Sequence, residues 1–285
     1  MYDVALSVLA CLRANTDVHV AWIVSAEEDD GTQAIALTPG GGQIGTLLDG
    51  AINDAIIRNL PDIGDGGGIV TISLGPAEAL MSGLPQGTEL SIGIVPGTAL
   101  PETIWTMFAD REPVSIAFAL DDRRLEGAEL LDDGNVPAGI ADDRLVVRYV
   151  PVPRMMIVGG GPVADALDNG FTLAGWQPMV VANPGNAGGA AATLSSIDGV
   201  IVMGHDVEMS GRALQDAISS KAGYIGSIGS IEMQELRREW LAYRGVAWDE
   251  RIHGPAGLPI GAANPGEMAI SIVAEAVAAS HLNNL

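Results

Sequence analysis

Residues 155–167, MMIVGGGPVADAL, place an apolar run directly before three glycines and an amphipathic stretch. The apolar run predicts a buried strand, and the stretch after the glycines predicts a helix. Gly159, Gly161 and Ala164 match the spacing G-x-G-x-x-[G/A], in which glycines allow a tight turn and a close approach of backbone to a phosphate. Two interpretations stay open, a phosphate-binding turn and a close-packed turn that holds no ligand.

The rest of the second half continues the alternation of strand and helix. Pro151 and Pro153 interrupt regular pairing and mark a domain boundary. We therefore predict an α/β protein with a C-terminal Rossmann-like doubly wound parallel sheet over 151–285, preceded by a smaller mixed α/β domain over 1–150. The expected elements of the second domain are strands at 154–158, 177–182, 198–203 and 222–229, and helices at 162–174, 210–220 (opened by Ser210), 230–243 and 265–280 (with Pro265 near its start).

The first half mixes helices with short strands. Ala5, Val8, Leu9 and Leu12 follow helical spacing, and Cys11 beside them is interpreted as core filling. The extended stretches 19–27 and 32–39 are expected to pair across the acidic turn 27–31. The other expected elements are a strand or turn entering a helix at 40–60, strands at 68–75, 89–97 and 114–120, a helix at 102–110, and an acidic, loop-like segment at 121–144, either without regular structure or with one exposed hairpin.

Charge and composition exclude several classes of protein. Lys and Arg total 14 against 36 Asp and Glu, a net charge of −22, which disfavours nucleic acid and anionic membranes as partners. Lys221 is the only lysine, so an anion site must use arginine, backbone N–H groups or helix ends. One cysteine excludes intrachain disulfides and cysteine-clustered zinc. No apolar run has the length of a membrane span, and the start lacks a basic leader, so we expect a cytoplasmic protein.

An NAD site needs an acidic residue after the second strand to bond the ribose hydroxyls. Asn183 stands at that position, and no arginine lies nearby for a 2′-phosphate. Ordinary NAD or NADP binding is therefore disfavoured.

Three later motifs place polar groups and glycines next to expected strands. GHDVEM at 204–209 follows a strand and puts His205 and Asp206 at the carboxyl edge of the sheet, either as ligand contacts or as a cap and loop anchor. GYIGSIGS at 223–230 again lets backbone approach a ligand before a helix. RIHGPAGLPIG at 251–261 pairs Arg251 and His253 with a Gly-Pro turn.

Together with the glycine turn, these motifs resemble the Rossmann domain of the XdhC/CoxI family, maturation factors for molybdenum hydroxylases. The family pattern is approximately G-A-G-H-V-A, then T-H-D-H-E, G-Y-I-G-x-I-G-S-R-R-K and R-I-H-G-P-I-G-L-D-I-G. The matching positions are Gly159, Gly161, Val163, Ala164, His205, Asp206, Glu208, Gly223 to Gly226, Ile228, Gly229, Ser230, Arg251 to Pro255, Gly257, Leu258, Ile260 and Gly261.

The sequence also departs from the family pattern. Pro162, Val207, Ile231, Glu232 and Pro259 replace family residues in the second half. In the first half the family has G-S-V-G-G-G-C-V-E, which corresponds here to GTLLDGAIND at 45–54. A second family cysteine corresponds to the region SLGPAEALMSG at 73–83. Both family cysteines are missing, so a thiolate that could ligate molybdenum or pass sulfur is missing with them.

The resemblance implies a maturation factor and chaperone rather than an enzyme. It implies transient binding of molybdopterin or its cytosine dinucleotide form, and insertion of this cofactor into an apo molybdenum hydroxylase of the xanthine or carbon monoxide dehydrogenase type. It also implies a homodimer, with a cysteine desulfurase as a further partner. It names no catalytic residue and no metal ligand. For Arg251 to Pro255, fold maintenance stands equally beside cofactor contact. The expected cofactor-binding residues are Gly159, Gly160, Gly161, Pro162, Val163, His205, Asp206, Gly226, Ser227, Gly229, Ser230, Arg251 and His253.

Two other functions stay open. One is an NAD(P)-binding oxidoreductase, against which Asn183 argues. The other is a degenerate scaffold that docks the target enzyme without holding the cofactor.

Overall fold

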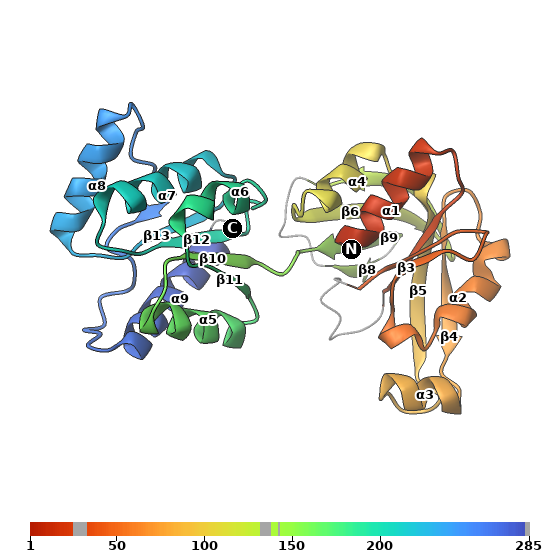
Figure 1. Ribbon diagram of the computed structural model, residues 1–285. Helices are drawn as coiled ribbons and strands as arrows, with labels where there is room; N and C mark the ends of the chain where they lie inside the picture. Colours follow the sequence, from red (N-terminus) through yellow and green to blue (C-terminus); the bar gives the residue numbers. More distant parts are fainter. Residues whose placement is uncertain (25–32, 132–137, 142, 283–285) are drawn as a thin grey trace. The chain divides into compact units, whose positions relative to one another are not determined.

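A computed structural model describes residues 1–24, 33–131, 138–141 and 143–282. The chain divides into two compact units, Met1–Pro151 and Val152–Leu285 (Figure 1). The first unit is not the smaller of the two, which reverses the expected order of size. In the described part of the chain, no helix is long and apolar enough to cross a membrane.

The first unit is built on a nine-stranded sheet with the order β3-β2-β1-β5-β4-β7-β6-β9-β8. Every neighbouring pair is antiparallel. The strands are β1 (His19–Ile23), β2 (Ile35–Leu37), β3 (Gln43–Gly45), β4 (Gly68–Ser73), β5 (Glu89–Pro96), β6 (Val114–Asp121), β7 (Arg124–Leu130), β8 (Gly139–Ala141) and β9 (Arg144–Tyr149).

Helices cover both faces of this sheet. The helical elements are α1 (Tyr2–Arg13), η1 (Leu48–Gly50), α2 (Asn53–Asn59), η2 (Leu60–Asp62), α3 (Pro76–Ser82), η3 (Gly97–Ala99) and α4 (Glu102–Ala109). β1 shows why two cores form, because its side chains alternate between the faces. Val20 and Trp22 pack with α1 and α4, whereas Ala21 and Ile23 pack with α2. The expected helix at the start of the chain is confirmed, and Cys11 is half-buried against the first of these cores.

Two expectations for the first unit have different outcomes. Pairing of the extended stretches is confirmed, since β1 and β2 are antiparallel with His19 opposite Leu37, whereas the acidic turn 27–31 lies outside the described residues. The loop expected at 121–144 is wrong. β7 pairs with β6, and β8 pairs with β9, so this segment contains two sheet hairpins. Its exposed polar side chains hid the strands, because a strand such as β7 can pair within the sheet while most of its side chains stay in water.

His19, the first residue of β1, is partly buried, and burial lowers its pKa from the usual 6.5. As the pH falls below 6.5, His19 in the folded protein binds fewer protons than His19 in the unfolded chain. The free energy of unfolding therefore declines on acidification. We expect His19→Gln to lose less stability between pH 7 and pH 5 than the natural chain, measured by hydrogen exchange in peptides of the first unit. An identical decline in both proteins would contradict this.

The second unit is built on a five-stranded sheet with the order β11-β10-β12-β13-β14, in which all pairs are parallel. The strands are β10 (Arg154–Val158), β11 (Gln177–Val181), β12 (Gly199–Val202), β13 (Tyr224–Ser227) and β14 (Ile252–His253). The helical elements are α5 (Pro162–Leu173), η4 (Pro184–Asn186), α6 (Ala187–Ala191), α7 (Val207–Ser219), α8 (Ile231–Tyr243) and α9 (Pro265–Leu282).

Helices pack on both faces of the parallel sheet, which confirms the predicted doubly wound fold (Figure 1). Met155 and Ile157 of β10 pack on the side of α5 and α9, and Met156 and Val158 on the side of α6 and α7. One predicted boundary is wrong. α7 begins at Val207, not at Ser210, because the Asp206 carboxylate accepts the Met209 N–H at 2.8 Å and caps the helix earlier.

Candidate ligand site at the carboxyl edge of the parallel sheet

The strand order reverses direction between β10 and β12, the place where open α/β sheets bind ligands. Both strands end here, at Val158 and Val202, and the loops 159–161 and 203–206 follow them. Gly159 has φ +135°, and a Cβ at this residue would collide with the side chain of Met203. The first glycine of the turn is therefore required by packing of one loop on the other, whether or not a ligand binds.

The second half of the turn is open. A Cβ placed on Gly160 or Gly161 meets no atom within 4 Å, and Gly161 has φ +90°. No side chain caps the start of α5, and Pro162 at its first position has no N–H. The next backbone N–H groups, of Val163 and Ala164, have no partner within a regular helix. Room, uncapped donors and the helix dipole therefore coincide at Gly160 to Ala164, which is an arrangement suited to an anion.

Val163 takes part through its backbone only, because its side chain packs against the core beneath α5. In the neighbouring loop, His205 is exposed and forms no hydrogen bond with the residues that the structure describes. Asp206 has a structural role as the cap of α7. Of the pair predicted here, His205 has its whole side chain available to a ligand, whereas Asp206 has one carboxylate oxygen engaged in the cap.

The predicted residues of the next loop support the fold. Gly226 lies within β13, where a Cβ would meet the Tyr224 hydroxyl and Ile201. Ser230 caps α8 by accepting the Met233 N–H at 3.3 Å, and a Cβ on Gly229 would press on Met233. Ser227 is fully buried, and its hydroxyl donates to Gln234 Oε1 at 2.6 Å. These residues hold β13 and the start of α8 in place at the carboxyl edge of the sheet.

Arg237 is the residue that the sequence analysis missed. Its side chain has 0% relative exposure and donates four hydrogen bonds, all to neutral oxygens. The acceptors are Ser210 Oγ at 3.0 Å, Ser227 Oγ at 2.7 Å, Ile228 O at 2.8 Å and Gly204 O at 2.7 Å. Desolvation lowers the pKa of Arg237. A buried cation that has no carboxylate partner among the described residues is unusual. The Arg237 guanidinium places positive charge next to the loops at 204 and 228, whose carbonyl oxygens it binds.

One pattern could have revealed this residue. Gln234, Arg237 and Leu241 are the buried residues of α8, at the spacing i, i+3, i+7 of a core-facing stripe. Two polar residues on such a stripe indicate a buried hydrogen-bond network. Gln234 completes it by donating to Ser227 O at 3.0 Å and to Gly229 O at 3.3 Å.

Arg251 lies away from this edge. It precedes β14, and its guanidinium binds the carbonyl oxygens of Ile218, Ser220 and Ala222 at the opposite, amino edge of the sheet. Asp249 accepts two further guanidinium hydrogen bonds and raises the pKa of Arg251. Arg251 thus ties the end of α7 to the start of β13, and the site proposed below does not include it.

His253 ends β14, opposite Gly226 of β13. Its ring packs on Tyr224 with centroids 4.8 Å apart, and its Nδ1 is 3.8 Å from Glu275 Oε1 on α9. Glu275 Oε2 accepts the Tyr224 hydroxyl at 2.8 Å and the Gly257 N–H at 2.9 Å. Burial and this carboxylate raise the pKa of Tyr224, which stays protonated. His253 therefore belongs to a polar cluster that fastens α9 to the sheet.

Asn183, at the position where NAD enzymes have an acid, is also engaged locally. Its side-chain oxygen accepts the Gly185 N–H at 3.0 Å and caps the turn η4. Asn183 therefore does not take the role of the acidic residue that binds the ribose hydroxyls in NAD enzymes. Among the described residues, no group of three His, Cys, Asp or Glu side chains could hold a metal ion.

In the first unit, the two segments that correspond to the family cysteines lie together, because α3 packs against η1. Within η1, Leu48, Asp49 and Gly50 have φ of +48°, +53° and +88°. Three successive residues thus adopt the left-handed conformation that glycine favours, although only one of them is glycine.

This strain predicts a stabilising substitution. Asp49→Gly removes a left-handed non-glycine residue at an exposed position and should stabilise the first unit by about 1 kcal/mol. Gly50→Ala is the matched opposite change and should destabilise it by about 1 kcal/mol. Chemical denaturation of the full chain, followed in the first unit by hydrogen exchange, measures both. If both substitutions changed the free energy of unfolding in the same direction, backbone strain at Asp49 would be contradicted.

A glycine turn at the switch point of a five-stranded parallel sheet defines a Rossmann-like domain. Residues 155–276 match the family model of the XdhC Rossmann domain. No curated protein matches the chain significantly. A crystal structure described as a xanthine dehydrogenase from Bacillus halodurans is 20% identical, with 99% of this chain and 96% of that chain covered and a TM-score of 0.47.

Proposed function

We propose that this protein is a non-catalytic maturation factor for a molybdenum hydroxylase of the xanthine or carbon monoxide dehydrogenase type. The match of residues 155–276 to the XdhC Rossmann domain is the observation that carries the proposal. In this function the protein works in the cytoplasm as a homodimer, binds molybdopterin or its cytosine dinucleotide form transiently, and passes it to the apo enzyme. A cysteine desulfurase is a further candidate partner.

The open turn supports cofactor binding at the phosphate end. Gly160 and Gly161 leave space for an anion, and the start of α5 offers uncapped N–H groups in a chain whose net charge is −22. Backbone donors and a helix dipole act locally, so they can hold a phosphate where the overall charge would repel it. Arg237 adds positive charge beneath the same edge.

Residues that could ligate the metal of the cofactor are less evident in this chain than residues that could bind its phosphate. Ala51 stands where the resemblance places the first family cysteine, and Cys11 packs against the core from α1. Soft thiolate ligation and transfer of sulfur by the family cysteines are therefore not part of the proposed function. The proposed site consists of Gly160, Gly161, Val163 and Ala164 through their backbone, with His205 beside them.

The test is purification under anaerobic conditions from a host that makes molybdopterin, followed by measurement of pterin fluorescence in the protein fraction. We expect pterin to copurify. If none copurifies, and none binds on titration, the function as a cofactor carrier fails and a docking scaffold becomes the better description. Titration with NADH and NADPH tests the oxidoreductase alternative, which would require micromolar binding together with turnover.

A further inference from the structure

The two carbonyl groups that Arg237 binds fix the direction of two backbone N–H groups. Gly204 O and Ile228 O accept hydrogen bonds from the guanidinium at 2.7 and 2.8 Å. Both peptide bonds that follow these carbonyls are trans. In a trans peptide the N–H of the next residue points opposite to the carbonyl oxygen. The N–H groups of His205 and Gly229 therefore point away from the buried guanidinium.

Neither of these N–H groups has a hydrogen-bond partner among the residues that the structure describes. Both lie outside the helices that follow them, because the Asp206 carboxylate caps α7 and the Ser230 hydroxyl caps α8. His205 is exposed, and Gly229 is half-buried. Two backbone donors are thus left for water or for a ligand at the carboxyl edge.

The charge of Arg237 makes these donors suited to an anion. The guanidinium is fully buried, and no carboxylate among the described residues pairs with it. Each of the two peptides has its carbonyl end on this charge and its N–H end directed outward, so the charge polarises the N–H. A buried cation is costly without a counter-charge. An anion held by both N–H groups would supply one.

Nearby carboxylates oppose an anion only weakly. Asp206 follows His205, and Glu232 lies in the first turn of α8. Both are exposed, so water and salt screen their charges, whereas the buried guanidinium is screened much less.

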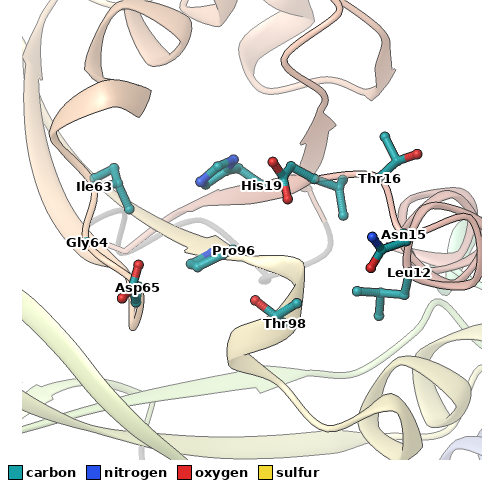
Figure 2. Close-up of a pocket in the computed structure, with 11 residues that line it drawn as sticks. Leu12, Asn15, Thr16, His19, Ile63, Gly64, Asp65, Pro96 and Thr98 are labelled. Atoms are coloured by element: carbon teal, nitrogen blue, oxygen red, sulfur yellow. The ribbon is translucent and has the colours of Figure 1, made fainter.

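The pocket of the first unit in Figure 2 has a volume of 420 Å³ but no comparable buried charge. Polar side chains in its lining, such as Asn15, Asp65 and Thr98, are exposed, and no arginine or lysine is among the described residues that line it. Water can satisfy exposed groups of this kind. The carboxyl edge of the second unit differs because an unpaired cation is buried behind its donors.

The two donors lie next to the glycine turn. β12 stands between β10 and β13 in the sheet, and a Cβ on Gly159 would collide with Met203, two residues before His205. Neighbouring strands of a sheet are about 4.8 Å apart. Anions bound at the two places would therefore be close enough to be parts of one ligand, such as two phosphoryl groups joined through one oxygen.

We infer that the carboxyl edge has a second anion subsite, formed by the N–H groups of His205 and Gly229 with the charge of Arg237 behind them. This subsite binds the second phosphoryl group of a diphosphate whose first lies at the glycine turn. The inference rests on the proposed function and deepens it. It assigns the cofactor in its dinucleotide form, which contains a diphosphate, rather than molybdopterin, which carries a single phosphate.

Amide NMR of the natural full chain tests the subsite, by titration with inorganic pyrophosphate and separately with inorganic phosphate. We expect pyrophosphate to shift the signals of His205 and Gly229 together with those of Gly160 and Gly161, and to bind at least about tenfold more tightly than phosphate. Shifts confined to the glycine turn, equal affinities for the two probes, or no binding of pyrophosphate would overturn the inference.

One pair of variants isolates the N–H of His205. His205→Pro removes this N–H, whereas His205→Ala, the matched control, removes the side chain and keeps the N–H. We expect the proline variant to bind pyrophosphate about tenfold more weakly than the alanine variant, and their affinities for phosphate to differ by less than about twofold. Hydrogen exchange across 199–243 checks that both variants are folded. Equal affinities of the two folded variants for pyrophosphate would contradict the subsite, and the NMR titration of the natural chain decides if the proline variant does not fold.

Copurification of pterin separates failure of this inference from failure of the proposed function. If pterin copurifies but pyrophosphate leaves the signals of His205 and Gly229 unmoved, the protein carries the cofactor and the second subsite is wrong. If pyrophosphate moves both signals but no pterin copurifies or binds, the second subsite stands and the proposed function fails.

Discussion

Arg237→Met is expected to destabilise the second unit by about 3–5 kcal/mol, a large part of the stability of an ordinary domain. Methionine can fill the space of the arginine side chain, but it donates no hydrogen bond. Gly204 O, Ile228 O and the hydroxyl of Ser210 would lose the partner that joins them within the protein. The loops at 204 and 228 should therefore open together. Hydrogen exchange across 199–243 measures this, with peptides of the first unit as an internal reference.

Arg238→Met is the matched control. Arg238 is the next residue of the same helix, and its exposed guanidinium lies 4.7 Å from the ring centroid of Trp248. Its loss should cost less than about 1 kcal/mol. Arg237→Lys should fall between the two, because one ammonium group cannot reach acceptors on three segments. If Arg237→Met and Arg238→Met behave alike, the buried network does not hold the carboxyl edge together.

Gly161→Asp is expected to weaken binding of inorganic pyrophosphate and of the pterin cofactor at least about 100-fold. The new carboxylate would stand at the uncapped start of α5, compete for its N–H groups and repel a phosphate. A Cβ at this residue meets no neighbour within 4 Å, so the fold should tolerate the change apart from the left-handed φ of +90°. Calorimetric titration with pyrophosphate gives the affinity directly.

Gly175→Asp controls for both charge and backbone strain. Gly175 follows the other end of α5, has φ +80° and also has open space around it. The same substitution there places the same charge on a residue that also has a positive φ, away from the candidate site, and should leave the affinity unchanged. A natural chain that binds neither pyrophosphate nor pterin, or two variants that lose affinity equally, would contradict a phosphate site at the glycine turn.

The sequence predicted the second unit well because its determinants are local. Apolar runs such as 155–158 can only form buried strands, and glycines at 159 and 161 permit the turn that leads into α5. Short segments without such periodicity were missed. α6 has the sequence AGGAA, which carries no helical pattern of its own, and β7 exposes many polar side chains. Both are held by the neighbours that they pack or pair with.

The sequence placed the glycine turn, but several side chains that it assigned to a ligand have partners within the fold. Gly160 and Gly161 remain available to a ligand, whereas Asp206, Ser227 and Ser230 hold helices or loops. Arg251 illustrates the reason. Arg251 and His253 are two residues apart in sequence. Arg251 lies before β14 at the amino edge of the sheet, whereas His253 lies at the end of β14, towards the carboxyl edge.

The sequence by itself determined the class of fold, the position of the glycine turn and the resemblance of residues 155–276 to the XdhC Rossmann domain, because spacing and glycine content constrain the chain over a few residues at a time. The tertiary structure alone decided which side chains meet. Arg237 shares the core-facing stripe of α8 with Gln234 and Leu241, but only packing of α8 on the sheet brings it to acceptors at 204, 210, 227 and 228. Burial makes such polar contacts decisive, and burial is a property of the folded chain.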